Sequence, residues 1–145
     1  ANFFDVNNPS SYTKSVTELL RIQEKFSKSN MNADDSVRVK IVLFSLNPEA
    51  DSIPELKKHL MDSHADERMW DYLTGDKKQI LTLAQKDFFN PTINTSILTL
   101  IDKEKHIRGI YNSSNIKEVN NLIDDIKVLM AEYYIKESKN KKADE

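Results

Sequence analysis

The stretch from Ala1 to Gln23, ANFFDVNNPSSYTKSVTELLRIQ, decides the expected fold. Its first six residues contain a Phe-Phe pair and predict a strand. Residues 9–11, Pro-Ser-Ser, predict a turn and a helix cap, because a Ser side chain at an N-cap satisfies an otherwise unpaired backbone N–H. A helix to about Ser29 follows, since apolar residues recur at helical spacing, at Val16, Leu19, Leu20, Ile22 and Phe26.

Beyond this helix, residues 37–46 begin as an alternating pattern and become continuously apolar, which is typical of a central strand covered on both faces. We expect a second helix from a cap at Asp51 or Ser52 to about His64. A short aromatic strand over residues 68–73 and a third helix over residues 77–88 come next. The apolar face of the third helix contains Ile80, Leu83, Ala84 and Phe88.

The last part of the chain predicts a hairpin and a closing helix. The two strands cover residues 96–102 and 107–111, and Ser113 or Ser114 caps the helix. This helix has a clear apolar stripe, formed by Val119, Leu122, Ile123, Ile126, Leu129 and Met130.

This order of strands and helices predicts an α/β fold of the thioredoxin-like class, with a central mixed sheet flanked by helices on both faces and one inserted strand–helix unit. We expect a single domain over residues 1–135, with an incomplete N-terminus because the first strand starts without a preceding turn. Any signal peptide, lipid anchor or membrane helix would then lie upstream. Residues 136–145 are densely charged, which predicts a flexible tail.

Composition excludes several classes of function. A net charge of −2 provides no basic field for nucleic acid. The chain has no cysteine, so it has no disulfide, no thiolate nucleophile and no zinc site of the CxxC kind. Only 2 glycines are present, which excludes a Gly-rich phosphate loop. No GxSxG nucleophile elbow is present, and the many carboxylates are interleaved with Lys and polar residues as on a solvated surface.

The opening stretch resembles the redox-active opening of the Sco/SenC family, thioredoxin-like copper proteins in which a strand ending in a Phe pair runs into a CxxxC turn and a helix. Pro9 matches the Pro that follows the first Cys of that pattern. The two cysteine positions are then Asn8 and Tyr12.

Three more segments resemble the family in the same order along the chain. Residues 45–51, Ser-Leu-Asn-Pro-Glu-Ala-Asp, are similar to its S-x-D-P-x-x-D segment, with Asn47 in place of the acidic residue. Residues 70–76 are similar to W-x-x-L-T-G. Residues 94–102 resemble the H-S-x-x-x-x-L-I-D stretch that carries a third copper ligand, and Asn94 takes the place of that His.

The resemblance implies a copper site made of two thiolates and one imidazole, and this chain has Asn8, Tyr12 and Asn94 instead. An amide oxygen is a hard, weak ligand for copper(I), and a phenol must lose a proton near pH 10 before it binds strongly. We therefore expect a vestigial site with no metal, no cofactor and no catalytic residue. Tyr12 either packs into the vacant site or contributes to a surface for a partner.

The sequence leaves two functional hypotheses open. The first is a non-catalytic Sco/SenC-like domain that binds another protein in assembly of the respiratory chain or the cell envelope, outside the cytoplasm. Those roles and that location are implied by the resemblance alone. The second is a copper metallochaperone with a relocated site at His59, Met61 and His64, since imidazole and thioether both bind copper. A thiol redox enzyme is excluded by the absence of cysteine.

Overall fold

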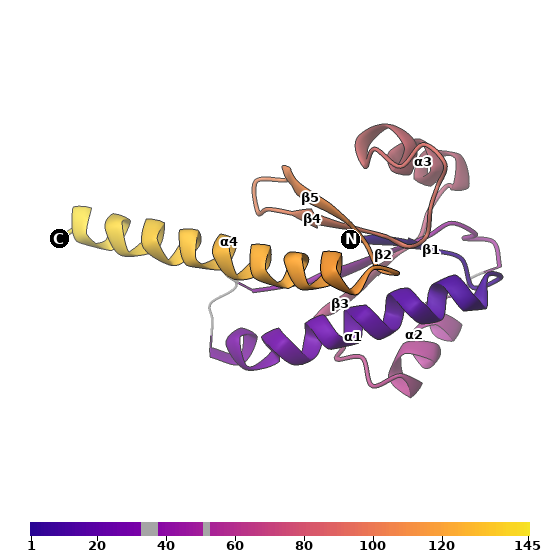
Figure 1. Cartoon of the computed structure of the whole chain (residues 1–145), viewed down its shortest axis with the longest axis horizontal. Coiled ribbons are helices and arrows are strands. Elements are labelled where there is room, and N and C mark those ends of the chain that lie inside the picture. The colour runs from indigo at the N-terminus through magenta and orange to yellow at the C-terminus, as the bar shows by residue number, and fades with distance from the viewer. Residues whose placement is uncertain (33–37, 51–52) are drawn as a thin grey trace.

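A sheet of five strands, in the order β3-β2-β1-β4-β5, forms the middle layer of the computed structural model (Figure 1). The structure describes residues 1–32, 38–50 and 53–145. Three strands are parallel, namely β1 (Asn2–Phe4), β2 (Ile41–Ser45) and β3 (Trp70–Leu73). The hairpin strands β4 (Ile97–Ile101) and β5 (Ile107–Asn112) pair with each other in antiparallel fashion, and β4 also lies antiparallel to β1.

Helices cover both faces of this sheet. Three of them, α1 (Pro9–Asn32), α2 (Ile53–Asp62) and α4 (Ile116–Ala143), pack on one face. The opposite face is covered by α3 (Lys77–Thr82), which continues as a π-helix over Leu83–Asp87. The predicted thioredoxin-like class, with an inserted β3–α3 unit at one edge, is therefore confirmed.

The Phe-Phe pair of β1 supplies both cores, because successive side chains of a strand point to opposite faces. Phe4 lies among the residues of α1 and α4, with Val16, Leu19 and Val119. Phe3 faces the other way and packs against Phe44 and Phe88, with ring centroids 4.9 and 5.0 Å away. The predicted apolar stripes of these helices are buried as expected, at Ile22, Phe26, Ile80, Ala84, Leu122, Ile123, Ile126 and Leu129.

Several predicted boundaries differ from the structure. The first helix already begins at Pro9, so Ser10 lies inside its first turn, in agreement with the preference for Pro at the first helical position. The last helix is capped by Asn115 rather than by Ser113 or Ser114, and its side chain accepts from the backbone N–H groups of Lys117 and Glu118. Val37, Asp51 and Ser52, which the sequence assigns to a strand and a helix cap, lie outside the described residues.

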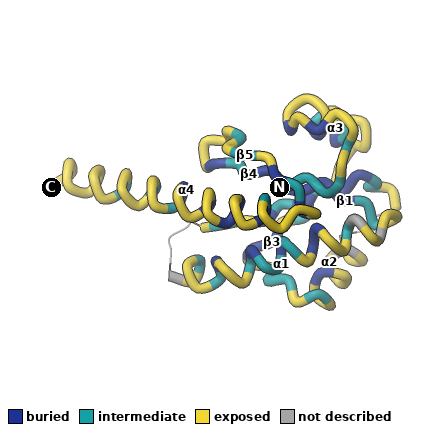
Figure 2. Tube along the Cα trace, in the orientation of Figure 1, coloured by how far each residue is buried: buried dark blue, intermediate teal, exposed yellow. Residues whose placement is uncertain are grey.

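The segment predicted as a flexible tail, residues 136–145, is helical in the structure as far as Ala143. This part of α4 extends beyond the sheet (Figure 1), and nearly all its residues are exposed (Figure 2). The helix continues into this charged segment because Lys, Glu and Ala are good helix formers even where they bury nothing.

Candidate functional site

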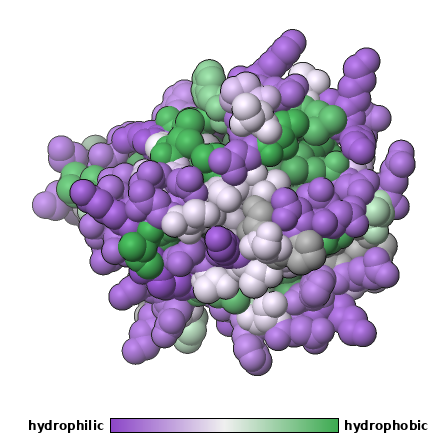
Figure 3. Space-filling view, turned by 45° about the vertical axis from the view of Figure 1, so that its right-hand side comes forward, coloured by the Kyte–Doolittle hydropathy of each residue, from purple (hydrophilic) through white to green (hydrophobic). Residues whose placement is uncertain are grey.

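The family-like segments at Asn8, Asn47 and Asn94 meet at one edge of the sheet. Because β1 and β2 are parallel, residues 5–8 and 46–50 follow the carboxyl ends of neighbouring strands. Because β4 runs antiparallel to β1, residues 94–96, which precede β4, lie at the same edge. We call this edge the site edge, and we call Asn8, Tyr12 and Asn94 the three ligand positions. Figure 3 turns the site edge toward the reader, and hydrophobic, neutral and hydrophilic side chains all reach the surface there.

Asn8 ends a tight turn that leads from β1 into α1. Its backbone N–H donates to the carbonyl of Asp5 over 3.0 Å, and its own carbonyl accepts from the N–H of Tyr12 over 3.2 Å. The Ser10 hydroxyl donates to Asn8 Oδ1 over 3.3 Å. The exposed Asn8 therefore accepts hydrogen bonds from the first turn of α1. Asn is a common residue at the N-cap of a helix.

Tyr12 fills the space behind this turn. It is half-buried, its hydroxyl oxygen is buried, and its ring lies against Phe4 and His59, with centroids 5.8 and 5.9 Å away. Burial, together with the nearby Tyr12, Glu67 and Asp71, raises the pKa of Tyr72 to about 12.

Asn94 belongs to a loop that is held by side-chain amides. Its Oδ1 accepts from the N–H of Ser96 over 2.9 Å, and its backbone bonds to the buried Asn90 at both N–H and carbonyl. The carbonyl of the next residue, Thr95, accepts from the buried side chains of Asn2 and Ser15 over 2.9 and 3.0 Å. The loop is thus fixed to both β1 and α1, whereas the Asn94 side chain is exposed.

The residues of the alternative copper site proposed from the sequence lie at the end of α2 and just beyond it. His59, Met61 and His64 are all exposed. The helix α2 ends at Asp62, and His64 has a φ of 65°. The N–H groups of His64 and Ala65 donate to the carbonyls of Met61 and Leu60, which is the left-handed helix ending known as the Schellman motif. In the described part of the chain, no three His, Asp or Glu side chains are placed to hold a metal ion.

One residue that the sequence prediction gives no role joins α1 to the neighbouring elements. Gln23 Oε1 accepts from the Trp70 indole N–H over 2.6 Å and from the backbone N–H of Asp66 over 2.7 Å. Its Nε2 donates to the carbonyl of His64 over 3.1 Å. Gln23 therefore ties α1 to the segment between α2 and β3. A lone Gln on a helix provides no sequence signal for such a role.

The residues at the three ligand positions do not fit copper. Copper(I) prefers soft sulfur donors, and these positions offer two amides and a phenol. Both amides also accept hydrogen bonds from their own turns. These side chains therefore offer no soft donor to copper(I).

Comparison of the sequence with models of known protein families finds no match, and comparison with curated proteins finds none either. Solved structures do share the fold. A SCO1/SenC family lipoprotein from Bacillus anthracis strain Ames superposes with a TM-score of 0.66 and 20% identity, over 81% of this chain and 71% of the lipoprotein chain. BsSco, a member of the Sco family of cytochrome c oxidase assembly proteins, superposes with a TM-score of 0.63 and 24% identity, over 81% of this chain and 70% of its own.

The chain therefore has the thioredoxin-like fold of the Sco/SenC proteins. BsSco is described as having a disulfide switch. The present chain has no cysteine and cannot form one.

Proposed function

We propose that this chain is a Sco-like domain that performs neither copper nor thiol chemistry and acts by binding another protein during assembly of a respiratory or cell-envelope complex. One observation carries this proposal: the fold is that of the Sco proteins, while the sequence resemblance aligns Asn8, Tyr12 and Asn94 with the copper ligands of that family. These residues stabilise the surface of the site edge instead of presenting reactive groups.

The same proposal includes an extracytoplasmic location, supported by the description of one structural neighbour as a lipoprotein and of another as an oxidase assembly protein. No helix within residues 1–32, 38–50 and 53–145 is long and apolar enough to cross a bilayer. Fractionation of the native cells tests the location, and recovery of the protein in the cytoplasmic fraction alone would contradict it.

Copper binding is the first test of the function. In a competitive titration with a Cu(I) chelator, we expect no one-to-one binding tighter than about micromolar, since two amides and a phenol are poor ligands for copper(I). The double variant His59→Ala, His64→Ala serves as the control and is expected to match the wild type. Tight stoichiometric binding that the double variant loses would overturn the proposal in favour of the relocated site.

Site-directed photo-crosslinking tests the partner. A photo-crosslinking amino acid is placed at the exposed Asn8 or Asn94, with Asn121 on α4, also exposed, as the matched control. In respiratory membranes, we expect Asn8 and Asn94 to crosslink to the same protein and Asn121 not to do so. Equal crosslinking from all three positions, or none from the site edge, would contradict binding through this edge.

A further inference from the structure

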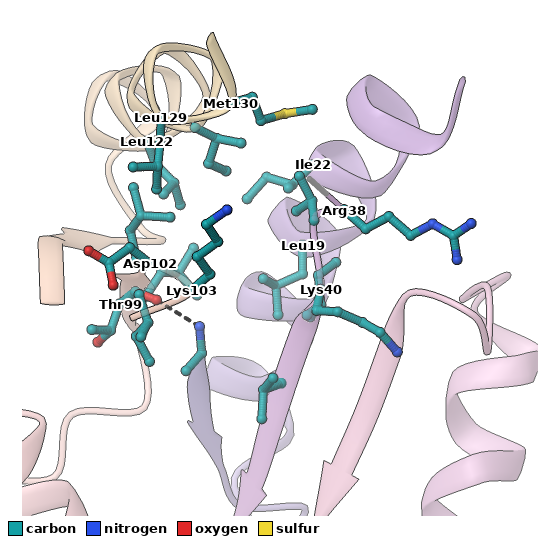
Figure 4. A pocket seen from close by; sticks show the side chains of 18 of the residues that line it. Leu19, Ile22, Arg38, Lys40, Thr99, Asp102, Lys103, Leu122, Leu129 and Met130 are labelled. Carbon is teal, nitrogen blue, oxygen red and sulfur yellow. Dashed lines mark hydrogen bonds between the residues drawn. The ribbon is translucent and has the colours of Figure 1, made fainter. Parts of the chain in front are cut away.

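The face of α4 that points away from the sheet carries two exposed branched side chains. Val128 is 58% exposed and Ile135 is 57% exposed. Figure 4 shows Leu122 and Leu129 pointing from α4 into the interior, so these two residues mark the buried face. Val128 and Ile135 lie seven residues apart, which is close to two helical turns, and both belong to the opposite face.

These two residues are part of a longer seam along α4. Residues that alternate at spacings of four and three lie along one line of a helix, as in a coiled coil. On this face they are Asp124, Val128, Ala131, Ile135, Ser138 and Lys142, and all six are exposed. We call them the outer seam. It has a carboxylate near one end, an ammonium at the other, and apolar or small side chains between them.

The second half of the outer seam belongs to the part of α4 that extends beyond the sheet (Figure 1) and is nearly all exposed (Figure 2). Isolated helices shorter than about 12–15 residues are marginal in water, because most helical stability in proteins comes from packing. A second helix along the outer seam would supply such packing. It would not meet the sheet of this molecule, because the sheet lies on the other side of α4.

The charges of the outer seam distinguish between the two directions in which two such helices could pair. In a parallel pair, Asp124 would face Asp124 and Lys142 would face Lys142, and like charges repel. In an antiparallel pair related by a two-fold axis, Asp124 of each copy faces Lys142 of the other. The outer seam is therefore complementary to itself in the antiparallel direction.

The same register also matches large side chains with small ones. With Asp124 opposite Lys142, Ile135 stands opposite Ala131 of the second copy, and Val128 stands opposite Ser138 of the second copy. In a coiled coil, each such side chain enters a hole between residues of the facing helix. A shallow surface hollow lies at the position that Val128 of the second copy would enter, and it is lined by Tyr134, Ile135, Ser138, Lys139 and Lys142.

We propose that the outer seam binds the outer seam of a second copy of this chain, with the two α4 helices antiparallel, and forms a two-fold symmetric dimer. Such a dimer uses the same surface on both copies. The proposal goes beyond the proposed function. β5 ends at the site edge and α4 starts there, so the outer seam lies on the part of α4 that runs away from that edge.

Sedimentation equilibrium of the purified chain tests the proposal. We expect a reversible dimer with a Kd on the order of 100 μM, because a contact confined to one helix is smaller than the about 1,200 Å² of a stable interface. Ile135→Glu places a carboxylate in the contact and should raise the Kd by roughly tenfold or more. The matched control is Ile116→Glu, at a position that is 62% exposed on another face of the same helix, and it should leave the Kd unchanged.

A charge exchange tests the antiparallel direction. Asp124→Lys alone puts two ammonium groups opposite each other at both ends of the contact, and should raise the Kd by roughly threefold or more. The double variant Asp124→Lys, Lys142→Asp restores opposite charges and should regain the affinity of the wild type. Circular dichroism confirms that each variant is folded, as expected for substitutions at exposed positions.

A chain that stays monomeric up to about 1 mM would overturn the proposal, since this concentration lies well above the expected Kd. Equal effects of Ile135→Glu and Ile116→Glu would overturn it as well, because the dimer would then not use the outer seam. An affinity that Asp124→Lys leaves unchanged would contradict the antiparallel pairing. None of these results depends on copper binding or on crosslinking at the site edge, so this proposal fails independently of the proposed function.

Discussion

At the scale of single residues, buried polar side chains form hydrogen bonds between segments that backbone pairing in the sheet does not connect. Asn2 is almost fully buried, and its Nδ2 donates to the carbonyls of Thr95 and Ile97 over 2.9 Å each. The Ser15 and Ser113 hydroxyls, both buried, share a hydrogen bond of 3.0 Å and join α1 to the turn before α4. These side chains are retained in the interior because every such bond satisfies a group that burial would otherwise penalise.

Gln23 makes the most informative contacts of this kind, and its substitution gives the prediction at this scale. The variant Gln23→Leu leaves the Trp70 indole N–H and the Asp66 N–H without their acceptor. We expect the free energy of unfolding to fall by roughly 1–3 kcal/mol, the cost of buried polar groups without partners. Urea denaturation followed by Trp70 fluorescence measures it.

The control for Gln23 is Gln85→Leu, at an exposed position whose amide makes one long contact of 3.4 Å to Pro91. Its effect should stay within about 0.5 kcal/mol. Equal effects of the two substitutions would show that the Gln23 hydrogen bonds do not stabilise the fold.

At the scale of elements, side-chain hydrogen bonds fix the turn of the β4–β5 hairpin and join β5 to α4. The buried Asp102 accepts from the N–H groups of His106 and Glu104, and these hydrogen bonds, with that of Arg108, hold the pKa of its carboxyl below its usual value. His106 thus lies in the hairpin turn with its backbone N–H bonded to Asp102, and its side chain is exposed. On β5, the Tyr111 hydroxyl donates to Asp125 on α4 over 2.6 Å.

This Tyr111 bond makes Gly109 a position where no side chain fits. A Cβ at Gly109 would lie 2.5 Å from Cζ of Tyr111, which is itself anchored to Asp125. We expect Gly109→Ala to lower the free energy of unfolding by about 1–3 kcal/mol, the usual cost of overpacking. Thermal denaturation measures the effect as a fall in the melting temperature.

The other glycine of the chain is the control for this prediction. A Cβ at Gly75 meets nothing within 4 Å, so Gly75→Ala should be neutral or stabilising by up to about 1 kcal/mol. A Gly109→Ala variant as stable as Gly75→Ala would mean that Tyr111 moves away freely.

At the scale of the whole molecule, segments distant in the chain end at the same edge of the sheet. Asn8 and Tyr12 follow β1, whereas Asn94 precedes β4, and only the antiparallel pairing of these two strands brings them to one end. The surface proposed to bind a partner protein therefore lies at the carboxyl end of β1.

Introducing the family's copper ligands at Asn8, Tyr12 and Asn94 tests whether these three positions share one site. We expect the triple variant Asn8→Cys, Tyr12→Cys, Asn94→His to bind one equivalent of Cu(I) more tightly than the wild type, because two thiolates and an imidazole are suitable soft and borderline ligands. A Cu(I) chelator competition measures the affinity, and circular dichroism confirms that the variant is folded.

The double variant without Asn94→His is the matched control and should bind more weakly than the triple variant. Should the folded triple variant bind no better than the wild type, the three ligand positions would not share one site.

Much of the fold followed from local pattern. The Phe-Phe pair identified β1, and helical spacing identified the buried stripes of α1 and α4, because side-chain direction in a helix is set by the backbone period alone. The same reasoning did not find the end of α4 at Ala143 or the cap at Asn115. Several residues in each region have suitable propensity, and the choice among them depends on contacts such as that of Ser113 with Ser15.

The sequence by itself determined the class of fold and the lack of thiol chemistry, since periodicity and composition are properties of the chain. Only the tertiary structure decided that Gln23 connects α1 to the segment before β3 and that His64 ends α2 in a left-handed conformation. The physical reason is the same in each case. Hydrogen-bond partners and strand neighbours far apart in the sequence are chosen by packing, and no local pattern records that choice.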